Sequence, residues 1–283
     1  MKLLAQIRKD IDFNQSLYSL VDVLKSVAIS QYRTLEKKVK SFEKFFSCLE
    51  DFFALIDTSG SSHPLVNVAD RRAGVIAVTS DGGLVGGLNA QVMNLALKEV
   101  RNSQAKLVVV GDKGKLYAQE NNIPFVAFPG IKDEMRLVQA EELRDYITSQ
   151  ELSGKLGPVK IIYPYAFSIM SQTVKALTIF PFSKEAMIGQ REGSPGALGL
   201  VMESALDDIA GYLIYLFLGH KFCEIFGFSR LAELSGRFVH LENSKTKIEQ
   251  LNKQLRLEYF RQRHELIDRN MRELLAARLK FGE

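Results

Sequence analysis

The chain has 283 residues, 46% of them hydrophobic and 25% charged, which is the composition of a globular protein with enough chain for one large domain or two smaller ones. The net charge of +4 is too small to indicate nucleic-acid binding by itself. Two cysteines without a CxxC spacing, and four histidines at no metal-ligand spacing, argue against a disulfide scaffold and a zinc site, so we expect neither a metal nor a cofactor.

Residues 1–57 predict a long N-terminal helix, because they contain neither Gly nor Pro and carry apolar residues at steps of three and four. The stripe begins Leu17, Val21, Leu24, Ala28 and continues from Tyr32 to Ile56. The step of four between Ala28 and Tyr32 is a stutter in an otherwise seven-residue repeat. Breaker residues at 58–64 end the helix. Charged residues follow the first five at once, so no signal peptide is expected.

Residues 72–182 predict an α/β domain of the Rossmann-like kind, since short apolar runs alternate with helical patterns in the manner of a mostly parallel sheet. Strands are expected at 74–79, 107–110, 124–128 and 159–163, with an edge strand at 173–182. Helices are expected between them at 88–102, 113–121 and 140–150. Residues 183–199, rich in Gly, Ser and Pro, predict a loop.

Residues 200–283 predict a second long helix, about 100 Å or more in length. Its apolar stripe consists of Leu231, Leu234, Phe238, Leu241, Ile248, Leu251, Leu255, Tyr259, Ile267, Met271 and Leu274. The longest apolar run, 209–218, is shorter than the roughly 20 residues of a membrane span. A helix this long needs a partner to cover its stripe. The N-terminal helix is the obvious one, so we expect the two to form an antiparallel coiled coil with the α/β domain between them.

Residues 80–89, with the sequence SDGGLVGGLN, follow the first strand and open a helix, where a phosphate-binding loop would lie. The spacing is neither GxGxxG nor GxxxxGK[ST], and no Lys follows. The other interpretation is a structural turn whose glycines supply positive φ and close backbone approach. Its members would be Asp81, Gly82, Gly83, Gly86, Gly87 and Asn89. Nothing in the chain assembles a nucleophile, a base and an oxyanion site, so no catalytic residue is expected.

Several segments, in chain order, resemble one known family. Residues 24–28 (LKSVA) resemble MKMVA, 80–89 resemble SDRGLCGGLN, 167–172 (FSIMSQ) resemble the segment before the last strand of the family's domain, 233–238 (ELSGRF) resemble ExxARM, and 255–264 (LRLEYFRQRH) resemble LxLxYNxxRQ. The family is the gamma subunit of F-type ATP synthases, and the match covers nearly the whole chain. The resemblance implies a non-catalytic central-stalk rotor that couples ion-driven rotation to ATP synthesis or hydrolysis.

The resemblance also implies partners and contact residues. The partners are the alpha and beta subunits of the catalytic ring, the epsilon subunit and the membrane c-ring, with no nucleic acid. The location is the cytoplasmic face of the bacterial inner membrane, as a peripheral subunit. Arg263 and His264 stand where the family's RQ pair engages the catalytic subunits, with Lys25 and Arg33 expected opposite on the N-terminal helix.

Two alternatives remain open. Phe260, His264 and Asp268 depart from the family's pattern, which leaves room for a gamma-like shaft of a repurposed ATPase that lacks the ion-translocating ring. The second alternative is a nucleotide-binding α/β protein that uses the loop at 82–87. This second alternative explains neither long helix.

Overall fold

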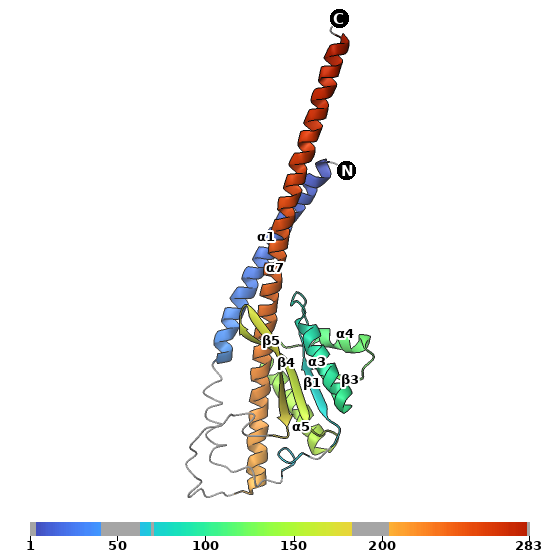
Figure 1. Ribbon diagram of the computed structural model, residues 1–283. Coiled ribbons are helices and arrows are strands. Elements are labelled where there is room, and N and C mark those ends of the chain that lie inside the picture. The colour runs from blue at the N-terminus through green and yellow to red at the C-terminus, as the bar shows by residue number, and fades with distance from the viewer. Residues whose placement is uncertain (1–3, 41–62, 69–70, 183–203, 282–283) are drawn as a thin grey trace. The chain divides into compact units, whose positions relative to one another are not determined.

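The computed structural model describes residues 4–40, 63–68, 71–182 and 204–281. In chain order the elements are α1 Leu4–Lys40, β1 Gly74–Val78, α3 Leu88–Ser103, β2 Lys106–Val110, α4 Asp112–Glu120, β3 Phe125–Phe128, α5 Arg136–Leu152, β4 Val159–Ser168, β5 Ser171–Phe180 and α7 Leu206–Phe281 (Figure 1). Two long terminal helices with strands and helices between them confirm the predicted fold class. The helix expected at 41–57 and the loop expected at 183–199 lie outside the described residues.

The chain falls into two compact units, one of residues 1–27 with 240–283 and one of residues 28–239. Both long helices run through the two units, because α1 and α7 are each continuous in the described chain. The domain boundaries expected from the sequence, 1–57, 72–182 and 200–283, stay a prediction.

The larger unit is built on a five-stranded sheet in the order β3-β2-β1-β4-β5. The pairs β1–β2, β1–β4 and β2–β3 are parallel, whereas β4 and β5 form an antiparallel hairpin that makes β5 the edge strand, as predicted. The strand β4 continues past the expected end at residue 163, since its pairing with β5 runs on to Ser168 opposite Ser171. All five residues of β1 are buried, which explains its continuous apolar sequence.

Each face of the sheet has its own apolar core, because successive strand residues point to opposite faces. One core joins strand residues such as Ile76 and Val108 to Leu143 of α5 and to Phe222 and Phe226 of α7. The other joins alternate strand residues to α3 and α4 through Val75, Ala77, Val109, Val92, Met93 and Ala118. In this unit α7 is therefore a core helix, covered on one side by the sheet.

One stretch of α7 reaches a mean hydropathy of 1.3, so by length and composition it could cross a membrane. Half of that stretch is buried inside the protein, as the residues of a core helix are.

The smaller unit is an antiparallel pair of helices, as predicted; we call α1 from residue 4 to 27 with α7 from residue 240 to 263 the helix pair. Polar contacts fix its register: Lys25 Nζ lies 2.8 Å from Glu242 Oε2, Lys245 Nζ donates to Asp22 Oδ1 at 2.6 Å, and Tyr18 Oη donates to Glu249 Oε1 at 2.9 Å. In these three contacts the residue number on α1 falls as the residue number on α7 rises, as expected for antiparallel helices. Extending this register sets Leu4 opposite residue 263, so about the last 18 residues of α7, some 27 Å, continue without α1 (Figure 1).

Two predicted stripe positions of the helix pair are wrong. Leu24 is 38% and Leu251 is 50% exposed, and the neighbouring Lys25 and Asn252 lie nearer the seam instead. Lys25 is only 17% exposed because its methylenes are covered while its ammonium reaches Glu242. The end of the predicted stripe, from Ile267 on, is exposed because it lies beyond the first residue of α1.

Candidate functional site

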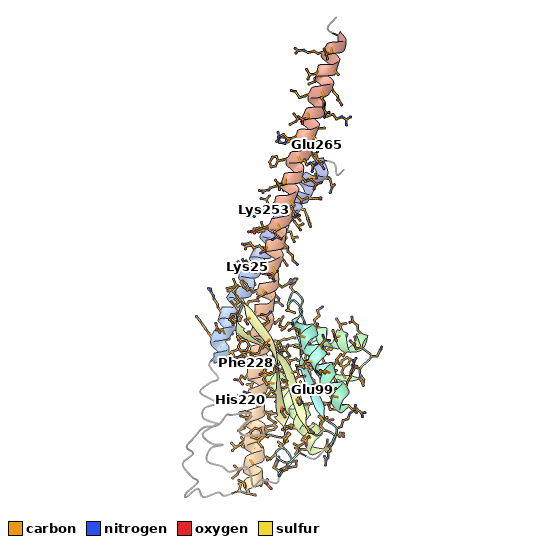
Figure 2. The ribbon with its side chains drawn as sticks, viewed as in Figure 1. Lys25, Glu99, His220, Phe228, Lys253 and Glu265 are labelled. Carbon is orange, nitrogen blue, oxygen red and sulfur yellow. The ribbon has the colours of Figure 1, made fainter. Side chains whose placement is uncertain are left out.

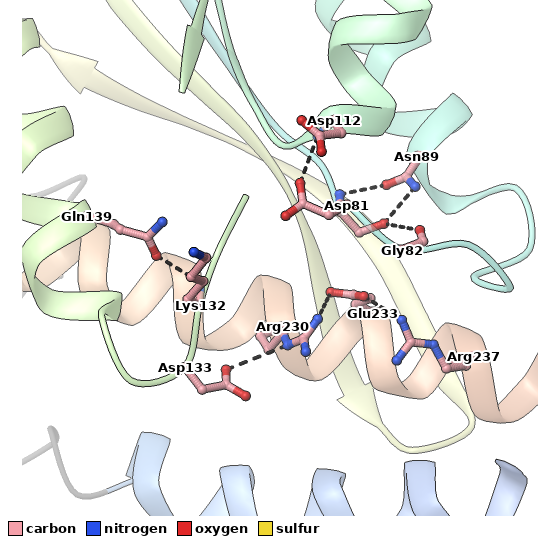
Figure 3. A network of polar contacts seen from close by, with 11 residues as sticks. Asp81, Gly82, Asn89, Asp112, Lys132, Asp133, Gln139, Arg230, Glu233 and Arg237 are labelled. Carbon is pink, nitrogen blue, oxygen red and sulfur yellow. Dashed lines mark hydrogen bonds and ion pairs between the residues drawn. The ribbon is translucent and has the colours of Figure 1, made fainter. Parts of the chain in front are cut away.

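The glycine-rich loop at 80–89 is closed by three hydrogen bonds at the start of α3 (Figure 3). The Ser80 backbone N donates to Asn89 Oδ1 at 3.1 Å, and Asn89 Nδ2 donates to Ser80 Oγ at 2.8 Å. Ser80 Oγ in turn donates to the Gly82 carbonyl at 2.9 Å. Asn89 therefore acts as a clamp between the first turn of α3 and the end of β1.

Asp81 connects this loop to two further segments at the carboxyl edge of the sheet. Its carboxylate accepts a hydrogen bond from the Asp112 backbone N at 2.8 Å, at the start of α4, where the helix dipole favours a negative charge. A Cβ at Gly130 would lie 2.0 Å from Asp81 Oδ1, so the loop between β3 and α5 passes directly against the carboxylate. That loop is held by Gln139, which donates to the Gly130 carbonyl and accepts from the Lys132 backbone N, both at 2.8 Å.

The glycines of the loop differ in what the structure requires at each position. Gly86 has a φ of +64°, which favours glycine. Gly82 lies against α7, since a Cβ there would come within 2.8 Å of Arg237 Nη2. Gly83 and Gly87 are exposed with open space around them, and nothing in the structure requires glycine at either position.

Opposite Gly82, α7 carries a buried carboxylate between two guanidinium groups. Glu233 is 6% exposed, and it accepts a hydrogen bond from Arg230 Nη1 on one oxygen and from Arg237 Nη2 on the other, the second at 2.7 Å (Figure 3). Asp133, in the loop after β3, lies 3.6 Å from Arg230 Nε. We call Arg230, Glu233, Arg237 and Asp133 the Glu233 cluster.

The charges of the Glu233 cluster support one another. Burial of the Arg230 guanidinium acts to lower its pKa, but the Glu233 carboxylate and Asp133 outweigh it, and the pKa of Arg230 lies above its ordinary value. Sequence reasoning did not select these residues as a site. Their spacing held a signal, since residues three and four apart on a helix are neighbours, but it indicates only contacts within α7.

The space between the loop and α7 is too small for a nucleotide. The cavity has a volume of about 30 Å³, and the residues that line it include Thr79, Ser80, Asp81, Asn89, Arg230 and Glu233. That is about the volume of one water molecule in the liquid, whereas ligand pockets measure roughly 300–1,000 Å³. The geometry therefore favours the structural interpretation of the glycine loop over the phosphate-binding one.

The four residues predicted to contact the catalytic subunits belong to different parts of the two long helices. Arg263 and His264 are exposed, and His264 Nδ1 lies 2.8 Å from the Phe260 carbonyl of its own helix. Lys25 is occupied by Glu242 and lies about 31 Å from Arg263 along the helix pair, counted from the register. Arg33 is exposed and belongs to the other unit. That these residues engage catalytic subunits stays a prediction.

The smaller unit leaves two sets of large apolar side chains exposed. On α1 they are Phe13, Leu20, Val23, Leu24 and Val27, whose spacing sets them on one face of the helix. On α7 beyond the start of α1 they are Leu266, Ile267, Met271, Leu274, Leu275 and Leu279. Beyond Glu265 the side chains of α7 point outward, and none of the described residues of α1 lies beside this part of the helix (Figure 2).

Comparison with known proteins gives a consistent set of relatives. A family model described as ATP synthase matches residues 3–278. The ATP synthase gamma chain of Clostridium beijerinckii is 25% identical over 96% of each chain, and that of an Exiguobacterium species is 24% identical over 97% of this chain and 98% of its own. Among solved structures, the rotor of the Euglena gracilis mitochondrial ATP synthase superposes with a TM-score of 0.65 at 16% identity, covering 93% of this chain and 98% of its own. The central stalk and c-ring structure of the Tetrahymena thermophila enzyme gives 0.60 at 17% identity, covering 80% and 99%. These two likenesses show the fold.

Proposed function

The chain belongs to the ATP synthase family, and we propose that it is the central-stalk rotor of an F-type ATP synthase, of the gamma type. In that role it couples ion-driven rotation to ATP synthesis or hydrolysis in a ring of alpha and beta subunits. Its relatives named ATP synthase gamma chain match it over nearly their full length, which supports the assignment of the whole chain.

The observation that carries this function is the exposed apolar surface of the smaller unit. A helix that ends in six exposed large apolar residues is costly in water, and such surfaces mark contacts with other proteins. A second apolar face, on α1, lies on the other helix of the same unit. A ring of subunits that encloses the helix pair and the end of α7 would cover both surfaces.

The geometry suits a shaft that does no bond chemistry. The helix α7 has 76 residues and is about 114 Å long. The side chains of its exposed part, among them arginines, carboxylates and large apolar residues, do not repeat identically around the helix, so each side presents a different surface to what surrounds it. Three equivalent catalytic sites around such a shaft would each meet a different face. Rotation would then change their relative free energies of nucleotide binding, which is a coupling free energy between shaft angle and affinity.

The same role implies the remaining partners. The epsilon subunit and a membrane c-ring would bind the α/β unit, and the solved structures that the chain resembles include assemblies with the F1 sector and the c-ring. We place the chain at the cytoplasmic face of the bacterial inner membrane, as a peripheral and non-catalytic subunit.

Affinity capture from gently detergent-solubilised native cells tests this function. The tagged chain should bring down alpha, beta, epsilon and c-ring subunits with ATPase activity in the eluate. Alpha- and beta-type subunits without c-ring subunits would instead identify a repurposed ATPase. Recovery of none of these subunits would contradict the rotor function.

A single substitution tests the predicted contact at Arg263. In the reconstituted complex Arg263→Ala is expected to lower the ATPase rate roughly tenfold, since a hydrogen bond to a charged group is worth about 1.5 kcal/mol or more. Arg269→Ala is the matched control, because Arg269 is paired with Glu273 of its own helix at 2.9 Å. Equal rates in the Arg263 variant and the unmodified chain would remove Arg263 from the contact surface.

A further inference from the structure

The larger unit has to hold α7 against rotation if the proposed rotor is to transmit torque. In this unit α7 is packed on the sheet through Phe217, Phe222 and Phe226, which are almost completely buried. Apolar burial is non-directional, so it stabilises equally any rotation of the helix about its axis that removes the same area from water. Hydrogen bonds and ion pairs, in contrast, depend on direction and specify register.

The contacts of α7 with the glycine loop lie within one turn of the helix, at Glu233, Gly236 and Arg237. Gly82 lies against Arg237 and Glu233, where a Cβ would come within 2.8 Å of Arg237 Nη2 and 3.4 Å of Glu233 Oε1. The same turn of α7 makes a second close contact with the loop, since a Cβ at Gly236 would lie 3.0 Å from the Val85 carbonyl oxygen. The loop backbone is thus seated on α7 between the side chain of Arg237 and the bare backbone of Gly236.

The loop after β3 reaches the same part of α7 from another element. Asp133 pairs with Arg230, and Arg230 shares Glu233 with Arg237. The two loops are joined to each other, because Asp81 packs against Gly130 and binds the Asp112 backbone N. Figure 3 shows the chain of polar contacts from Asp133 through Arg230 and Glu233 to Arg237, with the hydrogen bonds of Asp81 and Asn89 beside it.

We propose that Glu233 is a positioning residue for torque transmission, and that it fixes the rotational setting of α7 in the α/β unit by holding Arg230 toward Asp133 and Arg237 against Gly82. This inference rests on the proposed rotor function. Without the Glu233 carboxylate two guanidinium groups would lie side by side on one face of α7 and repel each other, and both loops would lose their contact. The bonds of Ser235 Oγ to the Ser168 and Ile169 carbonyls, and of Tyr215 to Asp145, would remain and keep the helix in place. The helix would nevertheless twist more freely about them.

Torsional stiffness is the property that such a role changes. The complex of this chain with its own alpha and beta subunits is fixed to a surface through the ring. A gold rod is attached to a cysteine introduced at Lys98, an exposed position of α3, in a Cys48→Ser background. The angular variance of the rod during the pause before each ATP-driven step reports the compliance between the ring and the α/β unit.

Glu233→Gln is expected to raise this variance about twofold, because the amide keeps one acceptor oxygen and sets its NH2 group against the second guanidinium, so one of the two contacts is lost. The ATPase rate should stay unchanged, since the substitution lies in the other unit from the part of α7 that the ring surrounds. Gly82→Ala perturbs the same contact from the loop side with every charge kept, and it should raise the variance too. Glu224→Gln is the matched control, because Glu224 pairs at 2.7 Å with Lys221 on α7 itself.

An unchanged variance in both Glu233→Gln and Gly82→Ala would overturn the proposal, and so would an equal rise in the Glu224 control. If Glu233→Gln prevents assembly, Gly82→Ala alone decides. If the unmodified chain assembles and rotates, and the variants show the same angular variance as the unmodified chain, only the role of Glu233 is refuted. An unmodified chain that does not assemble with alpha and beta subunits would refute the rotor function and this inference together.

Discussion

The two units of the chain use the same helix, α7, but hold it by different forces. In the larger unit three phenylalanines of α7, Phe217, Phe222 and Phe226, are almost fully buried against the sheet side of the core. In the helix pair the buried apolar cluster has only three members, Val21, Leu241 and Ile248, with Leu17 and Tyr18 beside it. Ile7 of α1 is also buried, and the polar contacts across the seam, such as Lys25–Glu242 and Lys245–Asp22, lie at partly exposed positions.

This difference indicates a gradient of stability along one continuous helix. Buried apolar area contributes most of the free energy of folding, whereas exposed ion pairs contribute little and are screened by salt. Local opening therefore should begin in the helix pair, where α1 has few buried contacts, and should reach the larger unit only on global unfolding. For a shaft that a ring of subunits surrounds, the partners would supply the burial that the helix pair lacks.

The largest expected effect concerns the apolar contacts that hold α7 in the larger unit. Phe222→Ala removes a fully buried ring from the core and leaves a cavity, so it should lower the free energy of unfolding by about 3–5 kcal/mol. Leu257→Ala, at a position 71% exposed on the same helix, should change it by less than about 0.5 kcal/mol. Urea unfolding followed by circular dichroism measures both. Similar losses in the two variants would contradict a stability gradient along α7.

A smaller effect separates buried from exposed charge. Glu151, at the end of α5, is 3% exposed, and burial raises the pKa of its carboxyl to about 7, with Arg71 acting in the opposite direction. The folded pKa is thus above the unfolded value, and the fold loses stability as the pH rises from about 4.5 to about 7, by up to roughly 3 kcal/mol.

Glu151→Gln should remove that loss and make the chain more stable than the unmodified protein above pH 7. Urea midpoints measured from pH 5 to pH 8 check this, with the exposed Glu134→Gln as the control. Parallel pH curves for the Glu151 variant and the unmodified chain would refute it.

The helix pair should respond to pH in the opposite sense. The hydrogen bond and charge of Lys245, with Lys25, hold the pKa of Asp22 below its ordinary 3.8 although desolvation opposes them. Stability from Asp22 is therefore present above about pH 3.8 and is lost as the pH falls through the lowered folded value.

Asp22→Asn removes this contribution at neutral pH. Hydrogen exchange of residues 4–27 at pH 7 should become roughly two- to fivefold faster in low salt, and the difference should shrink in 1 M salt, where the Debye length is about 3 Å. Asp12→Asn, at an exposed position of the same helix, is the control. An effect of Asp22→Asn that is independent of salt would point to packing rather than charge.

The sequence was sufficient for the elements because their signals are local. The runs at 74–79 and 107–110 are short, apolar and β-branched, and the long helices lack proline, so period and composition identify them. The seam was not predictable to the residue. Leu24 and Lys25 are both compatible with the apolar stripe, because the methylenes of a lysine can be buried. Only the carboxylate of Glu242 across the seam decides which of the two residues faces α7.

The Glu233 cluster could not be predicted for a similar reason. The sequence shows the spacing of Arg230, Glu233 and Arg237 along one helix, but Gly82 and Asp133 reach them only through the tertiary fold. The sequence therefore indicates a turn candidate in the glycine loop but does not reveal its partner on α7. The contact surface expected around Arg263 and Lys25 was drawn from resemblance, and the register of the helix pair separates the two residues.

The last prediction concerns Asn252, which lies beside the seam where Leu251 was predicted. Its Oδ1 is buried and has no hydrogen-bond partner in the described chain. Asn252→Leu removes an unsatisfied acceptor and adds apolar area, so it should stabilise the helix pair by about 1 kcal/mol and slow hydrogen exchange of residues 4–27 about fivefold. Gln254→Leu, at an exposed position two residues on, should leave the exchange rate nearly unchanged. Faster exchange in Asn252→Leu would mean that the asparagine holds the register of the two helices at a cost in stability, as a single polar residue does in coiled coils. The polar seam would then be a device for alignment, in contrast to the apolar core that anchors the same helix in the larger unit.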